Sequence, residues 1–325
     1  MATILSTKSL YYNDVNLIAK PAKINSRAEV PKELNRIVVS PMSSVIGVEF
    51  AKLASDLGLT VCLHRFCTPQ EQVSLYNSIK NKTNVYVSIG LNDWERAAIL
   101  RDNGVANWLI DVANGYIPNL KHTINKVLCY YSPVNMMVGN IMNKEGVQLF
   151  EEYGQFFSGT FSIRTGIAGG SACATSDVTG YNRGQITEIM ECSEEADPHN
   201  LKIVADGGIK NGNYAAKAFG AGADYVMMGG YFSKAKEAYT NTIGDGTYWG
   251  GASHKQQELY GGIKKHSEGK VIKIEEDLEL LEILVDDLWG GLSSAVSYGG
   301  CKTLTEFIGN GVFEVKQNSL PPKRN

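Results

Sequence analysis

One cysteine in this chain of 325 residues lies in a sequence context suited to nucleophilic chemistry. Cys173 follows the small residues 168–171 in the segment TGIAGGSACATSD. Small residues let backbone amide groups approach a ligand closely, and a thiolate is intrinsically a strong nucleophile. We interpret the other five cysteines as small buried side chains, because none belongs to a CxxC pair or to a Cys/His cluster with zinc spacing. The sequence therefore predicts that Cys173 attacks a bound ligand.

Two glycine pairs indicate a site for an anionic group. Gly207 and Gly208 lie in ADGGI, and Gly229 and Gly230 lie in MMGGY. Backbone N–H groups exposed at such positions bind phosphate, although glycine pairs also serve tight turns. Asp206 precedes the first pair, where its carboxylate would accept hydrogen bonds from sugar hydroxyls or else cap the next helix. These residues together predict a site for a sugar phosphate.

The residues that carry this chemistry follow short apolar runs, which alternate with segments of helical length. We expect eight strands, at residues 36–42, 59–65, 84–90, 107–113, 135–141, 160–166, 202–208 and 224–230. Such alternation is typical of βαβ units, and nearly continuous hydrophobicity is expected of strands buried on both faces. The fold class is α/β, and a closed (β/α)₈ TIM barrel is favoured over a doubly wound sheet.

Helices and terminal additions complete the expected single catalytic domain, residues 1–325. Residues 48–58 and 215–223 have apolar side chains at helical spacing and end in glycine. An N-terminal extension of about 35 residues and a C-terminal segment from residue 231 add loops and a helix at 275–292. We find no inserted regulatory domain. The predicted polar residues gather at the carboxyl ends of the strands, where barrel active sites lie.

Composition limits the possible partners. The net charge is −3, and lysine and glutamate are interspersed, so there is no basic stripe for nucleic acid. No apolar stretch approaches the roughly 20 residues of a membrane span, and the N-terminus has no signal-peptide pattern. We expect a cytoplasmic protein that binds neither nucleic acid nor membrane.

A series of motifs in order resembles the IMP dehydrogenase and GMP reductase family over nearly the whole chain. The motifs are YNDVNLI at Tyr12, HRF at His64, DVANGY at Asp111, GN at Gly139, GIAGGSACAT at Ile167, ADGGI, KAFGAGADYVMMGG and HSEGK at His266. DVANGY and HRF are similar to the reductase branch. The Arg-Tyr pair of the dehydrogenase flap is missing. The resemblance therefore favours a GMP reductase.

The resemblance implies NADPH-dependent reductive deamination of GMP to IMP and ammonia. Cys173 would attack purine C2, ammonia would leave, and the resulting thioimidate would accept hydride at C2. Thr175 and Glu268 match the pair that moves the proton for ammonia departure. From spacing alone, Glu268 is instead a solvated surface charge among lysines. The family match also implies a homotetramer.

Binding residues are carried over from the family by position. The nucleotide would contact Ser171, Asp206, Gly207, Gly208, Gly229, Gly230, Gly250, Gly251, Ala252, Lys265, Ser267 and Gly269. The cofactor would contact His64, Arg65, Asp111, Val112, Ala113, Ile167 and Ala168, with Ser294 and Ser297 reaching it in a neighbouring subunit. A monovalent cation such as K⁺ would bind at Ala168, Gly170 and Cys173.

The chain departs from the family pattern at the cysteine loop and the flap. Ala168 and Gly169 replace Gly and Pro, which should loosen the loop. Lys265 stands where Arg is expected and lacks its planar fork. The substrate therefore stays open between GMP and a related 2-aminopurine nucleotide. IMP dehydrogenation and a non-catalytic nucleotide-binding barrel are the alternative functions.

Overall fold

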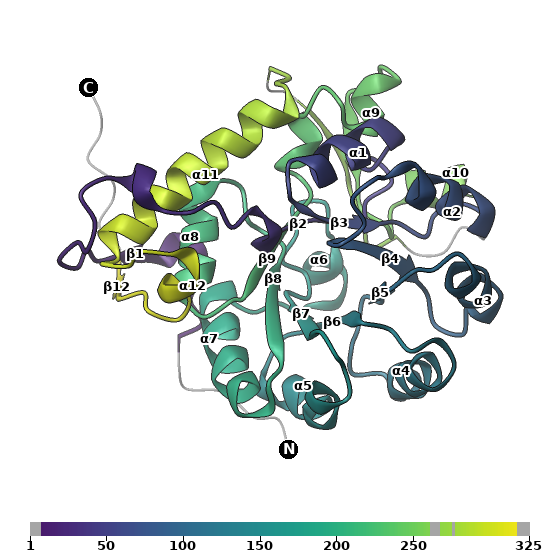
Figure 1. Cartoon of the computed structure of the whole chain (residues 1–325), viewed down its shortest axis with the longest axis horizontal. Coiled ribbons are helices and arrows are strands. Elements are labelled where there is room, and N and C mark those ends of the chain that lie inside the picture. The colour runs from purple at the N-terminus through teal and green to yellow at the C-terminus, as the bar shows by residue number, and fades with distance from the viewer. Residues whose placement is uncertain (1–7, 261–266, 275–276, 317–325) are drawn as a thin grey trace.

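A computed structural model describes residues 8–260, 267–274 and 277–316, and its centre is a closed barrel of eight parallel strands (Figure 1). The strands are β2 (Ile37–Val39), β3 (Thr60–Leu63), β4 (Val85–Ile89), β5 (Asn107–Asp111), β6 (Asn135–Ile141), β7 (Phe161–Thr165), β8 (Lys202–Asp206) and β9 (Tyr225–Met228). Each pairs in parallel with its neighbours in chain order, and β9 closes the ring on β2. The barrel prediction and all eight strands are confirmed. Most strands end before their predicted limits, because the polar and glycine residues that follow turn away into the loops of the barrel mouth.

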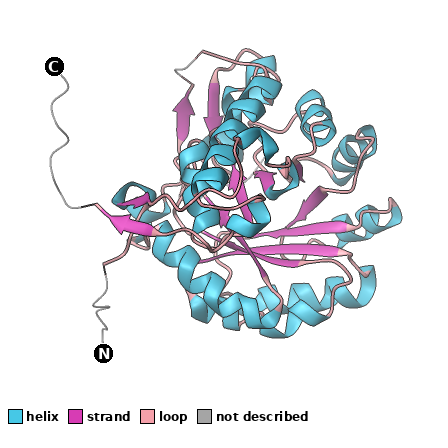
Figure 2. Ribbon diagram, turned by 60° about the vertical axis from the view of Figure 1, so that its left-hand side comes forward, coloured by secondary structure: helices cyan, strands magenta, loops and turns pink. Residues whose placement is uncertain are grey.

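Helices surround the barrel, as the side view in Figure 2 shows. They are α1 (Val48–Asp56), α2 (Pro69–Ser78), α3 (Trp94–Asp102), α4 (Pro118–Tyr131), α5 (Lys144–Gln148), α7 (Gln185–Ala196) and α8 (Gly212–Gly220). The helices predicted at 48–58 and 215–223 correspond to α1 and α8, which are followed by Gly58 at φ +89° and Gly222 at φ +114°. Only residues 64–68 connect β3 to α2, so no domain is inserted between this strand and this helix. Among the described helices, none combines the length and apolar character needed to cross a bilayer.

The barrel interior is a small apolar core separate from the larger core outside it. Its members point inward from seven strands: Val38, Cys62, Tyr86, Leu109, Met137, Val204 and Met227. The alternate residues of the same strands face outward and pack against the helices. Side chains therefore fill the lower barrel, and the ligand space must lie above them at the carboxyl ends of the strands.

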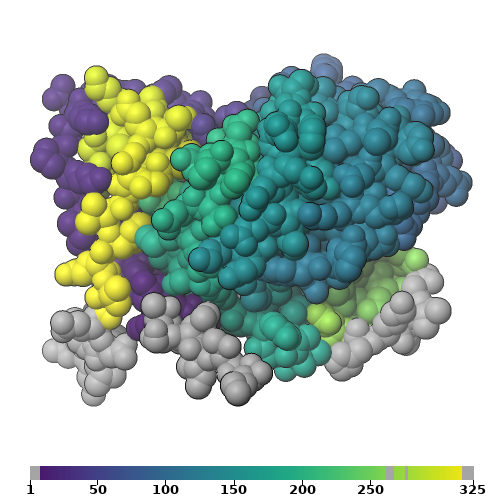
Figure 3. Space-filling view, turned by 90° about the horizontal axis from the view of Figure 1, so that it is seen from below, coloured from purple at the N-terminus to yellow at the C-terminus, as the bar shows by residue number. Residues whose placement is uncertain are grey.

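The first and last described segments of the chain lie together on one side of the barrel, where Figure 3 shows purple residues beside yellow residues. β1 (Val15–Leu17) pairs antiparallel with β12 (Phe313–Val315), and α12 (Leu304–Phe307) precedes β12 in the chain. This pairing with β12 holds the N-terminal extension against the body of the protein.

Short 3₁₀ helices occur at Tyr12–Asp14, Arg27–Glu29, Leu34–Arg36, Glu151–Gln155, Asp197–His199 and Phe232–Lys234.

The predicted C-terminal helix is shifted along the chain. Helix α11 spans Leu281–Tyr298 instead of 275–292; residues 275 and 276 lie outside the described part. It starts late because Glu279 is extended, where it exchanges backbone hydrogen bonds with Lys234 and Lys236. It continues beyond residue 292 because Ser293 and Val296 stay buried against the core. A Cβ on Gly212 would lie 3.3 Å from the Cα of Gly291, so this glycine serves close packing of α8 on α11.

An antiparallel hairpin near the barrel mouth was not predicted. β10 (Thr247–Trp249) pairs with β11 (Val271–Lys273), with α9 (Tyr239–Thr242) before β10 and α10 (His254–Leu259) between the two strands. Helix α6 (Thr175–Thr179), which begins just after Cys173, lies near the middle of the ring in Figure 1. Gly269, two residues before β11, forms a β-bridge with Cys173, so the hairpin borders the cysteine loop.

Candidate active site at the barrel mouth

A cavity of about 690 Å³ opens at the carboxyl ends of the barrel strands and contains most of the predicted site residues. The three predicted catalytic residues, Cys173, Thr175 and Glu268, line it. So do the predicted nucleotide contacts Ser171, Asp206, Gly207, Gly208, Gly229, Gly230, Gly250, Gly251, Ala252 and Gly269, and the predicted cofactor contacts Arg65, Asp111, Val112, Ala113, Ile167 and Ala168. The fold therefore gathers residues from distant parts of the chain around one opening.

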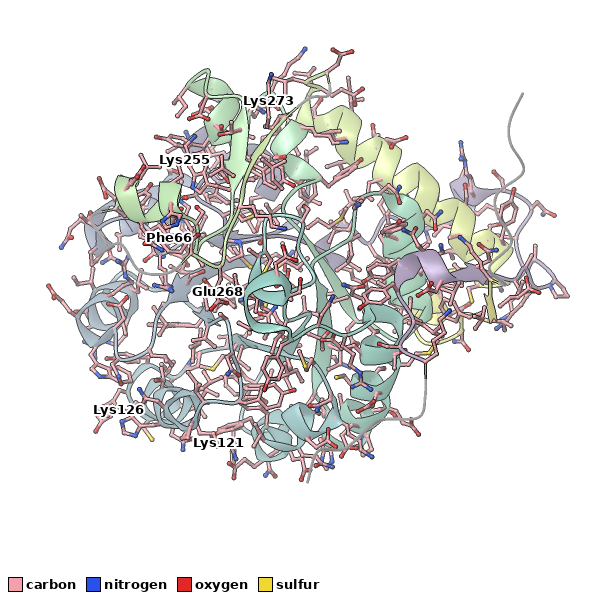
Figure 4. All side chains as sticks on the ribbon, turned by 180° about the vertical axis from the view of Figure 1, so that it is seen from behind. Phe66, Lys121, Lys126, Lys255, Glu268 and Lys273 are labelled. Atoms are coloured by element: carbon pink, nitrogen blue, oxygen red, sulfur yellow. The ribbon has the colours of Figure 1, made fainter. Side chains whose placement is uncertain are left out.

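Cys173, Thr175 and Glu268 form a continuous hydrogen-bonded chain. The thiol of Cys173 donates to Thr175 Oγ1 across 3.1 Å, and the Thr175 hydroxyl donates to Glu268 Oε2 across 2.9 Å. Figure 4 shows Glu268 over the middle of the barrel, with Phe66 nearby. Because a hydroxyl both donates and accepts, Thr175 connects a thiol to a carboxylate that could take or return its proton. Glu268 is thus half-buried and hydrogen-bonded at the cavity, unlike the solvated surface charge that spacing alone suggested.

Backbone pairing holds the Glu268 segment against the cysteine loop. The N–H of Ala174 donates to the carbonyl of Glu268 across 2.7 Å, and the N–H of Lys270 donates to that of Ala172 across 2.8 Å. Gly269 lies between Cys173 and Ser253 and forms a β-bridge with each. A Cβ on Gly269 would lie 2.5 Å from the Ser253 nitrogen, so only glycine fits between the two segments. Backbone hydrogen bonds on both sides of Glu268 therefore fix where its side chain begins, beside the cysteine loop.

The cysteine loop packs directly on the glycine turn after β8. Gly166 has φ +117°, and a Cβ there would lie 1.8 Å from the carbonyl oxygen of Asp206. A Cβ on Gly207 would lie 2.7 Å from the nitrogen of Gly170. Ala168 adopts φ +65°, a left-handed conformation that costs energy for a residue with a side chain. The two predicted ligand-binding segments are thus in contact through backbone atoms.

Tyr248, which sequence reasoning missed, completes the end of the cavity predicted to hold phosphate. Its hydroxyl lies 2.7 Å from Ser171 Oγ, and a Cβ on Gly230 would lie 3.0 Å from the same hydroxyl. The residue therefore brings a hydroxyl to a place where a serine hydroxyl and a glycine turn already converge. Its position just before Gly250 and Gly251 was the only sequence signal.

A buried arginine joins two of the predicted ligand-binding carboxylates. Arg164 on β7 donates from Nη1 to Asp111 Oδ1 at 2.8 Å, and from Nε and Nη2 to Asp206 Oδ2 at 3.2 and 3.0 Å. Burial raises the pKa of Asp111, but Arg164 and Arg65 outweigh it and hold that pKa below its ordinary value. Arg164 was also missed, although a single charge in the apolar run TFSIRTG was a usable signal. The helix-capping alternative for Asp206 is wrong, because Asn211 caps α8 through Tyr214 N.

Several predicted binding residues lie away from the cavity. His64 is buried beside Phe66, and burial lowers its pKa to about 4, so its ring is neutral. The Ser267 hydroxyl lies within hydrogen-bond distance of the carbonyls of Ala252 and Gly269 and does not line the cavity. Ser294 and Ser297 are partly exposed on α11 and do not line the mouth of this chain. Lys265 lies outside the described residues.

The remaining cysteines are not all buried, which corrects the sequence interpretation. Cys62, Cys192 and Cys301 are buried, and Cys67 is half-buried. Cys129 is exposed near the end of α4, because it occupies the solvent side of an amphipathic helix. All are free thiols, and among them and Cys173 only Cys173 lines the mouth cavity.

A second, shallower hollow adjoins the mouth and shares part of its wall. Arg65, Asp111, Val112 and Ala113 line both spaces. The hollow continues over the loop after β4, lined by Gly90, Leu91, Asn92 and Asp93, and by Asn114 and Ile117. Its continuity with the mouth suits a ligand longer than a mononucleotide, with one end near Cys173 and the other over the β4 loop.

Known proteins resemble this chain over most of its length. A family model described as the IMP dehydrogenase / GMP reductase domain matches residues 9–319. The chain is 29% identical to a GMP reductase of Onchocerca volvulus, an alignment that covers 96% of this chain and 92% of the relative. It is also 29% identical to human GMP reductase 1, with 96% of each chain covered. A GMP reductase of Klebsiella pneumoniae is 28% identical over 91% of this chain and 92% of its own.

Proposed function

The chain belongs to the IMP dehydrogenase and GMP reductase family, and we propose that it is an NADPH-dependent GMP reductase. The reaction converts GMP, NADPH and a proton into IMP, ammonia and NADP⁺. The observation that carries the proposal is the chain of hydrogen bonds Cys173–Thr175–Glu268 at the mouth of the barrel. It supplies a nucleophile for purine C2 and a route for the proton that the leaving ammonia requires.

The nucleotide would lie across the cavity with its phosphate at the glycine turns. Ser171, Tyr248 and the N–H groups near Gly229 and Gly230 offer uncharged donors for a phosphate group. Asp206 Oδ1 accepts no hydrogen bond from the described residues and would accept from the ribose hydroxyls. This orientation leaves the purine facing Cys173.

Cys173 attacks C2 after its proton passes through Thr175 to Glu268, and a carbon–sulfur bond forms. The same route returns a proton to the 2-amino group, so that the C2–N bond breaks and ammonia leaves a thioimidate on Cys173. Arg65 and Asp111 to Ala113 would hold NADPH in the continuous wall of the two hollows. When bound there, the cofactor supplies the hydride that C2 receives before the carbon–sulfur bond breaks.

Two further expectations stay proposals. K⁺ would be held by the carbonyls of Ala168, Gly170 and Cys173; that of Gly170 already accepts a hydrogen bond from Cys173 N, which leaves it one lone pair. A homotetramer would cover the outer surface of α11, where Ile283 is 52% and Tyr298 69% exposed. Light scattering with the purified protein would measure the oligomeric state.

The direct test is a purified-enzyme assay. GMP-dependent loss of NADPH absorbance, with IMP and ammonia as products and none of it in Cys173→Ala, is the expected result. Formation of XMP from IMP and NAD⁺ would instead identify a dehydrogenase. Binding of GMP with no turnover, and no mass adduct on Cys173 with any purine nucleotide, would identify a non-catalytic binding barrel.

A further inference from the structure

Three charged side chains lie across the top of the barrel interior. Asp111 ends β5, Arg164 lies in β7, and Asp206 ends β8. Arg164 is 7% exposed, and its Nε, Nη1 and Nη2 atoms all donate to the two carboxylates. A buried guanidinium requires such partners, because leaving it unpaired in the barrel would cost far more than the pair itself contributes.

Each carboxylate has one oxygen directed to Arg164 and another available to the cavity. Asp206 Oδ2 accepts from Arg164 and, at 2.9 Å, from Asn140 Nδ2, while Oδ1 accepts from no described residue. Asp111 Oδ1 accepts from Arg164, while its Oδ2 lies 3.9 Å from Arg65 Nε, beyond hydrogen-bond distance. Asp206 Oδ1 and Asp111 Oδ2 therefore belong to carboxylates that are linked to each other through Arg164.

We propose that Arg164 is a positioning residue that couples nucleotide binding to cofactor binding. The inference rests on the proposed function, in which Asp206 contacts the nucleotide and Asp111 contacts the cofactor. A ligand that hydrogen-bonds one carboxylate orients the shared guanidinium, and the fork of Arg164 transmits that orientation to the other carboxylate. Arg164 also compensates the repulsion between the two carboxylates, which would otherwise oppose binding of anionic ligands.

Arg164 acts through these carboxylates and not on the reacting atoms. Three of its five N–H groups, one on each nitrogen, already donate to the two carboxylates, which fixes the orientation of the guanidinium plane. Lysine at this position would keep the charge but lose the planar fork that reaches both partners at once. The coupling should therefore depend on the shape of the side chain and not only on its charge.

Calorimetric titration of the full-length protein with GMP, without and with saturating NADP⁺, measures how strongly cofactor binding affects GMP binding. No reaction occurs, because NADP⁺ has no hydride to donate to the nucleotide. We expect NADP⁺ to change the Kd of GMP by roughly 5- to 150-fold in the wild type. In Arg164→Lys this factor should fall toward one. Arg36→Lys is the matched control, because the half-buried Arg36 side chain also donates three hydrogen bonds, but it lies just before β2 and contacts no residue that lines either hollow.

If Arg164→Lys fails to fold, the effect of each aspartate on the binding of the other ligand gives a second measurement. Asp111→Asn should weaken GMP binding, and Asp206→Asn should weaken NADP⁺ binding, although each residue faces the other ligand. If each variant alters only its own ligand, or if the wild type binds the two ligands independently, the coupling role is wrong. Failure of the wild type to bind either GMP or NADP⁺ would instead overturn the proposed function.

Discussion

Cys62 and Cys173 are chemically identical side chains that lie at different depths of the same barrel. Cys62 points into the apolar interior and is fully buried, which raises the pKa of its thiol well above the ordinary value. Cys173 lies at the rim, half-exposed to the cavity and hydrogen-bonded to Thr175. Because a thiol surrounded by hydrocarbon is inert, depth in the barrel decides which of these two cysteines a ligand in the mouth can reach.

The largest expected effect is loss of turnover in Cys173→Ala. Without the sulfur no thioimidate forms, so kcat should fall by more than about 10³-fold. Steady-state NADPH oxidation would measure it. Cys62→Ala is the matched control: it should keep kcat while lowering the free energy of unfolding by roughly 1–3 kcal/mol. Equal kcat losses in the two variants would remove the distinction between rim and interior.

Glu268→Gln should have the next largest effect. The amide cannot take the proton that Thr175 passes on, so kcat should fall by about 10²- to 10⁴-fold while GMP still binds. Rapid-quench measurement of ammonia release would locate the loss in the deamination step. Glu282→Gln, an exposed acid on α11, should leave the rate unchanged. An active Glu268→Gln enzyme would show that the hydrogen-bonded chain is not a proton route.

Gly166→Ala tests the backbone contact that supports the rim. The new Cβ would overlap the Asp206 carbonyl at φ +117°, so unfolding free energy should fall by about 2 kcal/mol or more, together with activity. Gly58→Ala provides the control, because φ is +89° there but nothing lies within 4 Å of the new Cβ. Its cost should be about 1–2 kcal/mol without loss of activity. Urea unfolding measures the free energy of unfolding of both variants. An equal decrease in the two variants would argue against the predicted clash.

Glu188 gives the smallest effect, which appears as a pH dependence. Burial raises the pKa of Glu188 to about 8, against the opposing effect of the Gly166 N–H group. Between about pH 4.3 and 8 the folded state therefore holds a proton that the unfolded state has lost, and stability falls as pH rises. Glu188→Gln should match the wild type at low pH and exceed it near pH 8, by at most a few kcal/mol.

Glu191 on the same helix is the control of opposite sign. Burial raises its pKa, but the hydrogen bond and charge of Arg183 outweigh burial and lower it below the ordinary value. Glu191 therefore stabilises the fold above its unfolded pKa and loses that contribution as pH falls. Thermal unfolding across pH measures the stability difference between the wild type and each glutamine variant. These two differences should change with pH in opposite directions, and a change in the same direction would contradict the assigned environments.

The alternation of apolar runs was enough to predict the barrel, because strands buried on both faces leave a repeated hydrophobic signature. Cys173, Thr175 and Glu268 were also recognisable as a group from their motifs. Tyr248 was missed because a place before two glycines marks a turn but does not identify a ligand contact. Arg164 was missed although a single charge in an apolar strand is a usable signal, because its carboxylate partners lie on other strands. The start of α11 was missed because Glu279 pairs with residues near 235, a contact distant in sequence.

The amino-acid sequence specifies which groups are available: a cysteine after small residues, glycine pairs, two carboxylates at strand ends and eight strands that carry them. Only the tertiary structure decided which of those groups meet. Closure of the barrel brings Asp111 and Asp206 within reach of Arg164, and the backbone pairing of residues 268–270 with the cysteine loop brings Glu268 to Thr175. The physical reason is that strand composition specifies burial locally, whereas contacts between side chains depend on register and on how distant segments pack.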